Sequence, residues 1–148
     1  RCDLCKHYFV ESSHFKSSSS SSNYSIKQNV TCTTKNAIYL ATCKICDKQY
    51  VGSTKTEFKV RFRNHKSDMK NNKKTCELAT HFNSLEHQVT DISFIVIETI
   101  TNFKNDSHLE SILLTREAYW TAQLCTLHPH GLNKRKEFRS KNRIHFTT

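Results

Sequence analysis

Two pairs of metal-binding side chains stand out in this sequence of 148 residues. Cys43 and Cys46 form a C-x-x-C pair at a predicted turn, and His81 and His87 follow in the stretch H-F-N-S-L-E-H. Two thiolates and two imidazoles are a complete ligand set for a tetrahedral structural zinc ion. The alternative is that the cysteines are small buried hydrophobic residues and the histidines lie on the surface. Because both halves occur in one chain, we expect a zinc site, with His108 as a weaker substitute ligand.

Three more cysteines near the start of the chain could form a second metal site. Cys2 and Cys5 make another C-x-x-C pair, and Cys32 follows downstream. The fourth ligand could be His7, His14 or a cysteine that precedes this sequence, because a chain that begins at an arginine is expected to be a piece of a longer polypeptide. The alternative is a basic arm with unligated thiols. The other cysteines follow no ligand spacing and are interpreted as ordinary thiols: Cys76 and Cys125.

The composition favours a polyanionic partner and reduced thiols. The formal net charge is +10 and the basic residues cluster in two blocks, so nucleic acid is the first candidate partner and an anionic membrane surface the second. Seven cysteines accompanied by nine histidines favour metal binding over a secreted disulfide framework. No run of about 18 apolar residues and no signal-peptide segment occurs. We therefore expect a nucleic-acid-binding chain without a membrane segment.

A second group of polar side chains is spread along the chain in a fixed order: Tyr39, Tyr50, Arg61, His65, Glu117 and Asn133. Each has an ordinary explanation when it is taken singly. Tyrosines are common in strands, an arginine on a basic helix is usually solvated, and a histidine on an apolar face is usually a core residue. The glutamate could pair with Arg116 or a distant lysine, and the asparagine could be a turn residue after Gly131. Only their order and spacing together indicate a function.

The first half of the chain is predicted to hold an arm and a hairpin. Residues 1–35 are basic and serine-rich and are expected to form an irregular arm, with the serine run at 17–22 as a flexible loop. Segments 36–42 and 48–54 are β-branched and aromatic enough for two antiparallel strands. The C-x-x-C pair between them lies at the turn, so any bound metal would hold the hairpin closed.

Two helices and a third strand are predicted next. Residues 56–69 place apolar side chains at helical spacing, and a short helix follows around 78–85. Residues 91–100 are apolar on both alternating faces, so we expect a strand covered on both sides at the centre of the sheet. The buried face of the first helix is predicted to comprise Phe58, Phe62, His65 and Met69.

The last helix is predicted over residues 107–124, where S-H-L-E has the spacing of a capping box. Glu117 falls within the stripe of this helix that is otherwise made of Leu109, Leu113, Trp120 and Leu124. An acid in an apolar stripe indicates a role beyond packing. Residues 134–148 are too charged to pack and are expected to be a basic tail that is solvated or faces DNA.

Motifs in this order resemble those of the GIY-YIG nuclease family. They are A-I-Y, then Y-V-G after ten residues, F-x-x-R-x-x-x-H on the following helix, E-x-x-W on a late helix, and P-x-G-L-N after it. The resemblance covers roughly residues 36–133. The C-x-x-C between the two tripeptides, with an H-x5-H downstream, is more narrowly similar to the endonuclease domain of Penelope-like retroelements.

The resemblance implies a small mixed α/β (α+β) fold, in which helices flank a three-stranded antiparallel sheet. It makes Tyr39 and Tyr50 the tyrosines of the two signature motifs, and it places Gly52 where the backbone must come close. Arg61 becomes the arginine directed at phosphate. Glu117 becomes the carboxylate that holds a divalent Mg²⁺ or Mn²⁺ ion.

Two further positions match those of homing-type members, and one departs from the family pattern. The matching positions are His65 and Asn133. Ala37 stands where the first motif has a leading glycine, and its methyl group is expected to be tolerated in a strand. The general base stays open between Tyr39, which is the family's proposed base, and His65, whose ordinary pKa is nearer neutral pH.

The resemblance implies a Mg²⁺-dependent DNA endonuclease with an inserted zinc site. In Penelope-like retrotransposons such a domain nicks DNA, and the 3′-OH primes target-primed reverse transcription by the reverse transcriptase domain of the same polyprotein, so the expected location is nuclear. The expected layout is an arm at 1–35, the nuclease domain at 36–133 and a tail at 134–148. The rival interpretation is a catalytically silent zinc-containing DNA-binding module. The sequence does not assign an oligomeric state.

Overall fold

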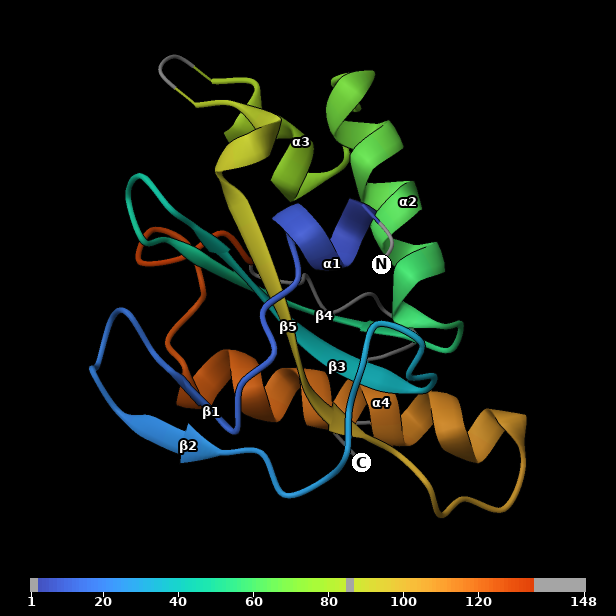
Figure 1. The fold of residues 1–148 in the computed structure, drawn as a ribbon. Coiled ribbons are helices and arrows are strands. Elements are labelled where there is room, and N and C mark those ends of the chain that lie inside the picture. Colours follow the sequence, from blue (N-terminus) through green and yellow to red (C-terminus); the bar gives the residue numbers. More distant parts are fainter. Residues whose placement is uncertain (1–2, 85–86, 135–148) are drawn as a thin grey trace, which may run out of the picture.

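The computed structural model describes residues 3–84 and 87–134, and its centre is a three-stranded antiparallel sheet. Strands β3 (Ala37–Cys43), β4 (Gln49–Thr54) and β5 (Ile92–Thr99) lie in the order β4-β3-β5. The α+β architecture and the antiparallel three-stranded sheet flanked by helices are therefore confirmed (Figure 1).

The central strand is β3, so the prediction that 91–100 forms the centre of the sheet was wrong. Strand β5 is an edge strand, yet Phe94, Val96 and their neighbours are buried on both faces. Apolar residues on both faces of this segment suggested a central strand, but they occur here because both faces of the sheet are covered. The free edge of β5 is also partly covered, because Val10 N–H donates to Phe94 O at 2.8 Å and Phe94 N–H donates to Tyr8 O at 2.7 Å.

The two faces of the sheet carry two separate cores. On one face Tyr39 and Ala41 of β3 pack with the helices α1 (Asp3–His7), α2 (Phe58–Lys70) and α3 (Glu77–Phe82). On the other face Ile38 and Leu40 pack with α4 (Asp106–Gln123) and with the hairpin of β1 (His14–Lys16) and β2 (Asn23–Ser25). Figure 1 shows α4 on the side of the sheet away from α2 and α3. A site that uses both α2 and α4 must therefore reach around a sheet edge.

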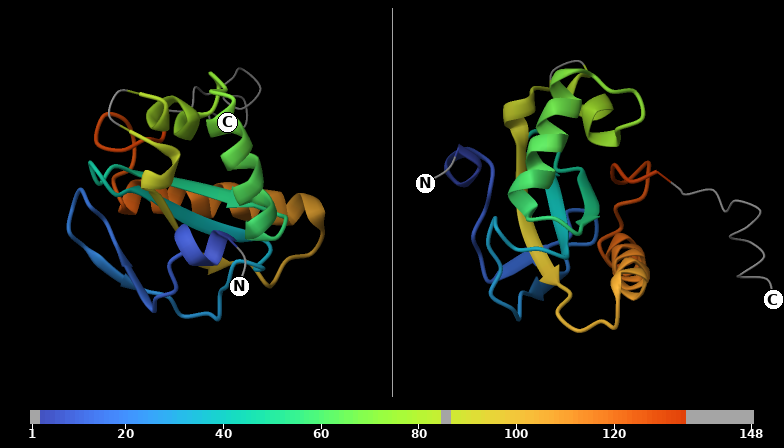
Figure 2. Two further views of the ribbon diagram at one scale, coloured as in Figure 1. Left: turned by 45° about the horizontal axis from the view of Figure 1, so that its top comes forward. Right: turned by 90° about the vertical axis from the view of Figure 1, so that its right-hand side faces the viewer.

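The segment before residue 36 is folded onto the domain, which corrects the expectation of an irregular arm. Leu4, Tyr8 and Phe9 enter one core, and Phe15 enters the other. The β1–β2 hairpin lies beside the sheet in each view (Figures 1 and 2). The serine run is also anchored, because Ser17 is fully buried and its hydroxyl donates to Leu124 O at 2.7 Å. A run of serines is typical of a flexible loop, but the small hydroxyl side chain of serine also fits a buried turn.

Helix α4 begins one residue earlier than predicted and uses a different cap. The N-cap is Asn105, whose side-chain oxygen accepts the backbone N–H of His108 at 2.8 Å. The predicted S-H-L-E capping box at 107–110 therefore lies inside the helix. The apolar stripe is as expected at Leu109, Leu113 and Leu124, which are buried.

The short 3-10 helix η1 (Val89–Asp91) leads from the α3 region into β5. No helix in the described part of the chain is long and apolar enough to cross a membrane. The tail predicted at 134–148 lies, beyond Lys134, outside the described residues.

Candidate active site

Tyr39 lies at the centre of the predicted catalytic group. Its ring is fully buried on the face of β3 that meets α2. Its hydroxyl oxygen is 2.6 Å from His65 Nε2, and Arg61 Nε–H donates to the same oxygen at 3.3 Å. Arg61 and His65 are four residues apart on α2, so both side chains project toward one strand. Three of the residues singled out in the sequence therefore lie together, while their catalytic roles stay a prediction.

Gly52 provides the space that the Tyr39 ring occupies. The two residues are directly paired across β3 and β4. A Cβ atom at position 52 would lie 2.4 Å from both Cζ and Oη of Tyr39. Because real Cβ atoms do not approach so closely, any other residue would displace the ring. The expectation that the backbone must come close at Gly52 is therefore confirmed.

Burial keeps the side chains of Tyr39, Tyr50 and His65 neutral at physiological pH. It raises the pKa of Tyr39 to about 12, although the neighbouring Arg61 opposes this shift. Burial, with help from the positive charge of Arg61, lowers the pKa of His65 to about 3. Burial also raises the pKa of Tyr50, whose ring meets that of His65 edge-on with centroids 6.1 Å apart. At pH 7 the site therefore holds protonated tyrosines, a neutral imidazole and a guanidinium cation.

Glu117 approaches this group from the opposite face of the sheet, around the edge strand β4. It lies on α4, and its carboxylate accepts the Ser53 hydroxyl at 2.7 Å. Its negative charge raises the pKa of both Tyr39 and Tyr50, so it acts on both side chains across the strand. None of the family motifs includes Ser53. Strand alternation could have found it, since Gly52 faces α2 and the next residue must face α4.

A pocket of about 410 Å³ lies between β4, α2 and α4, and Ser53, the hydrogen-bond partner of Glu117, is among its lining residues. It is lined by Arg61 and Asn64 from α2, by residues 53–56 from β4 and its exit, and by Glu110, Leu113 and Leu114 from α4. Arg61 therefore presents its guanidinium both to Tyr39 and to this pocket. The pocket therefore connects Arg61 with Ser53, whose hydroxyl donates to Glu117.

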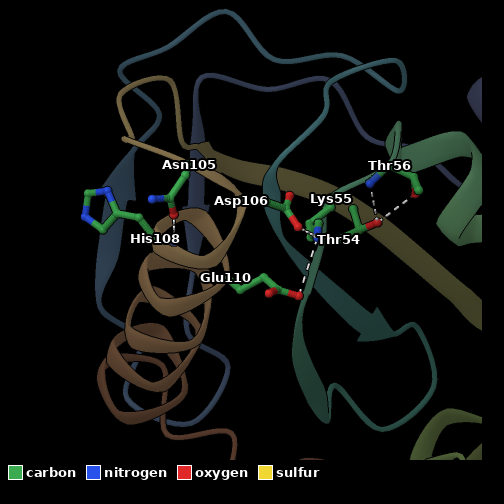
Figure 3. A network of polar contacts seen from close by, with 7 residues as sticks. All are labelled: Thr54, Lys55, Thr56, Asn105, Asp106, His108 and Glu110. Atoms are coloured by element: carbon green, nitrogen blue, oxygen red, sulfur yellow. Dashed lines mark hydrogen bonds and ion pairs between the residues drawn. The ribbon is translucent and has the colours of Figure 1, made fainter.

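Ion pairs close the outer end of this pocket. Figure 3 shows Lys55, at the exit of β4, reaching to two acids in the first turns of α4. Its ammonium lies 2.7 Å from Asp106 and 3.4 Å from Glu110. Asn105 caps the same helix end by accepting the N–H of His108 (Figure 3). These contacts join α4 to the exit of β4 about two to three turns before Glu117.

The residues around Glu117 suit a hard divalent cation. Its carboxylate accepts the hydroxyl of Ser53, and Ser53 also lines the pocket. Mg²⁺ prefers one or two carboxylates and keeps several waters, and an open pocket leaves room for them. The chain therefore offers a fitting site for the metal that the sequence resemblance implies.

Asn133 is not part of the group around Tyr39. Its side-chain oxygen accepts the backbone N–H of Val51 and the Thr126 hydroxyl, both at 2.8 Å, and its amide donates to Val51 O at 2.9 Å. Val51 lies between Tyr50 and Gly52 in β4. Asn133 is therefore a positioning residue for that strand, and nothing in this geometry gives it contact with reacting atoms.

Cys43, Cys46, His81 and His87 converge beside the β3–β4 turn, as predicted. Their ligand atoms all lie within 4.8 Å of one another. Cys46 Sγ and His81 Nε2 are 3.5 Å apart, and two ligands of a tetrahedral zinc ion would be about 3.6 Å apart. The turn itself is closed by Asp47 N–H donating to Cys43 O at 2.9 Å. This group can hold a metal ion without rearranging the hairpin.

The pKa shifts of this group favour metal binding at His81 and Cys46 and oppose it at Cys43. Burial, helped by the neighbouring His87, lowers the pKa of His81 to about 4, so the imidazole is neutral at pH 7. Burial raises the pKa of Cys43. Burial also acts to raise the pKa of Cys46, but hydrogen bonds from the Lys48 backbone and from His87 outweigh it, and the net shift is downward. Neutral imidazole and thiolate are the forms that bind metals.

The remaining predicted ligands are placed as follows. His108 is not near this group, because its Nδ1 accepts the N–H of Lys104 at 2.9 Å at the start of α4, so the suggestion of a substitute ligand was wrong. Cys5 and Cys32 of the second predicted site lie with their sulfurs 3.4 Å apart. Cys2 lies outside the described residues, so the second site stays a prediction.

Together the fold and the site define a small α+β enzyme domain that sets a tyrosine, an arginine and a carboxylate around one edge strand. A family model described as the GIY-YIG catalytic domain matches residues 35–125. The chain belongs to the GIY-YIG family and is a DNA endonuclease domain.

Two solved structures of the same enzyme are similar to this chain. The catalytic domain of the homing endonuclease I-TevI is 20% identical, with a TM-score of 0.48, covering 68% of this chain and 98% of that chain. A mutant of the catalytic domain of intron endonuclease I-TevI is 23% identical, with a TM-score of 0.53, covering 69% of this chain and 96% of that one. The second likeness supports the fold. No curated protein sequence matches the chain.

Proposed function

We propose that this chain is the Mg²⁺- or Mn²⁺-dependent DNA-nicking domain of a Penelope-like retrotransposon. In this role its nick would supply the 3′-OH for reverse transcription by a polymerase domain of the same polyprotein, in the nucleus. The observation that carries the nuclease part is the position of the Tyr39 hydroxyl between His65 and Arg61, with Arg61 and Ser53, the partner of Glu117, lining one pocket. The C-x-x-C pair inside the β3–β4 hairpin supports the narrower assignment, with zinc as the ion held there.

In the proposed reaction a water oxygen adds to phosphorus, the P–O3′ bond breaks and the leaving 3′ oxygen takes up a proton. Arg61 binds the phosphate, because its planar guanidinium can contact two phosphate oxygens while Nε remains on Tyr39. Glu117 would hold the divalent cation, which stabilises charge on the phosphate and leaving oxygens when bound. The products are a 3′-OH and a 5′-phosphate.

Tyr39 is the proposed general base, and Arg61 is its stabilising partner. A phenol whose pKa is about 12 is protonated at neutral pH, so it accepts the proton of water only after losing its own. The guanidinium at 3.3 Å favours the phenolate by charge and by hydrogen bonding. His65, with its pKa of about 3, is a weak proton acceptor and serves here to orient the hydroxyl.

The pH dependence of nicking distinguishes the two candidate bases. Because Tyr39 must ionise and its pKa lies near 12, we expect the single-turnover rate to rise about tenfold per pH unit between pH 6 and 9. His65 is already in its basic form above its pKa of about 3, so a rate that stays constant over this range would assign the base to His65. The measurement is a plasmid-nicking time course at constant ionic strength.

The surface of α2 can hold DNA by its phosphates. Exposed or half-buried cations follow this helix and its entry: Lys55, Lys59, Arg63, Lys66 and Lys70. Such contacts are insensitive to base sequence and weaken with salt. We therefore expect this domain alone to bind DNA with loose sequence preference and with steep salt dependence.

The proposed function is tested by the chemistry of the nick. The full chain with Mg²⁺ should convert supercoiled plasmid to open circles whose nicks a DNA polymerase extends without prior phosphatase treatment. Nicks that end in a 3′-phosphate, and need phosphatase before extension, would contradict the priming role while leaving the nuclease intact. If the chain binds DNA but forms no open circles in Mg²⁺ or Mn²⁺, the rival silent DNA-binding module is correct.

A further inference from the structure

A second group of metal-binding atoms includes His65 and is separate from the Cys43 group. It consists of a ring nitrogen of His65, a carboxylate oxygen of Asp68 and Cys76 Sγ, all within 4.8 Å of one another. His65 and Asp68 are three residues apart on α2, so they share a helix face. Cys76 is the N-cap residue of α3. The α2–α3 connection therefore brings nitrogen, oxygen and sulfur ligands to one point.

The ring of His65 is the most informative member of this group. The residue is only 2% exposed, and its Nε2 is bound to the Tyr39 hydroxyl. Its Nδ1 is buried and makes no hydrogen bond to any described residue. Buried polar atoms are nearly always satisfied, and an exception calls for a ligand, a water or an ion. Because Nε2 is already bound to Tyr39, Nδ1 is the ring nitrogen left to bind an ion together with Asp68 and Cys76.

We propose that His65 Nδ1, Asp68 and Cys76 bind a borderline transition-metal ion such as Zn²⁺. Three protein ligands with an open fourth position for water are typical of zinc sites that are not purely structural. Thiolate and imidazole donors disfavour Mg²⁺, so this ion is distinct from the one assigned to Glu117. Cys76 Sγ also accepts the backbone N–H of Ala79 at 3.4 Å, which suits a metal-bound thiolate.

A metal ion on Nδ1 would fix the hydrogen bond at the other end of the ring. A metal-bound neutral imidazole carries its proton on the second nitrogen, and that N–H is normally held by an outer partner. The outer partner is already present, because Tyr39 Oη lies 2.6 Å from Nε2. Tyr39 would then accept hydrogen bonds from both His65 and Arg61. The site would therefore position Tyr39 as an acceptor, whether or not the chain nicks DNA.

The test counts zinc ions in three versions of the full chain. Each protein is dialysed against buffered Zn²⁺ and its bound zinc is measured by elemental analysis. Cys76→Ser is expected to bind one equivalent less than the wild type. Cys125→Ser removes an exposed cysteine outside both groups and is expected to bind as much as the wild type. An unchanged zinc count in Cys76→Ser would overturn the proposal.

A second variant and a spectroscopic measurement guard against a simple folding defect. Asp68→Asn changes a partly exposed side chain and should also lose one equivalent while its circular dichroism spectrum stays that of the wild type. In long-range ¹H–¹⁵N spectra, adding zinc to the chain should hold His65 as the Nε2–H tautomer. An Nδ1–H tautomer in the zinc-loaded protein would also overturn the site, because a protonated Nδ1 cannot bind the ion.

Discussion

Replacing Glu117 with glutamine should lower Mg²⁺-dependent plasmid nicking at least about a thousandfold, equivalent to about 4 kcal/mol of activation free energy. Glutamine keeps the length of the side chain and can still accept the Ser53 hydroxyl, which now lies 2.7 Å from the carboxylate. It removes the negative charge that would hold the cation. DNA binding, measured by fluorescence anisotropy, should change little because the cations of α2 remain.

A matched control is available on the same helix. Glu110 lies two turns before Glu117, lines the pocket that Arg61 and Ser53 also line, and is paired with Lys55 at 3.4 Å. Since this acid already has a cation partner, Glu110→Gln should change nicking by no more than a few-fold. If Glu117→Gln nicks as fast as Glu110→Gln, Glu117 does not hold the catalytic cation.

Loss of the zinc ion that we propose at Cys43, Cys46, His81 and His87 should have the largest effect on stability. Zinc contributes about 10–16 kcal/mol to the folding of small zinc domains, so we expect Cys43→Ser to lower the free energy of unfolding by at least about 3 kcal/mol. Cys43 is fully buried at the end of β3, and His81 lies on α3. The ion would therefore tie the hairpin turn to the α3 region. Urea denaturation followed by circular dichroism measures the change.

The control for this variant is again Cys125→Ser, which should unfold at the wild-type urea concentration. Nicking by Cys43→Ser should fall together with its folded fraction, because a slip of one residue in the hairpin would turn Tyr39 and Tyr50 to the wrong face. Full nicking activity with an unchanged urea midpoint in Cys43→Ser would show that the hairpin does not depend on the ion.

The hairpin and its site could be predicted because local patterns determine them. Strand alternation puts Tyr39, Tyr50 and Gly52 on one face, and helical spacing puts Arg61 and His65 on one face of α2. Family motifs brought these two elements together and added Glu117. The sequence did not show how Glu117 reaches the site. Its helix lies on the opposite face of the sheet, and its carboxylate meets Ser53 at the edge strand β4.

The parts that were predicted wrongly depend on long-range packing. The serine run looked like a flexible loop, and only the structure shows Ser17 bound to Leu124 O. Strand β5 looked central because helices and the folded N-terminal segment cover it, which its sequence cannot reveal. The neighbours of Cys76 could not be found from spacing either, because His65 and Asp68 belong to another helix.

The most direct test of the central claim is the nicking rate of Tyr39→Phe. Phenylalanine keeps the buried ring that packs against Gly52 and removes only the oxygen that His65 and Arg61 contact. We expect this variant to remain folded, to bind DNA as the wild type does, and to nick supercoiled plasmid about 100- to 10,000-fold more slowly. If folded Tyr39→Phe nicks plasmid at the wild-type rate, the Tyr39 hydroxyl is not the centre of this active site.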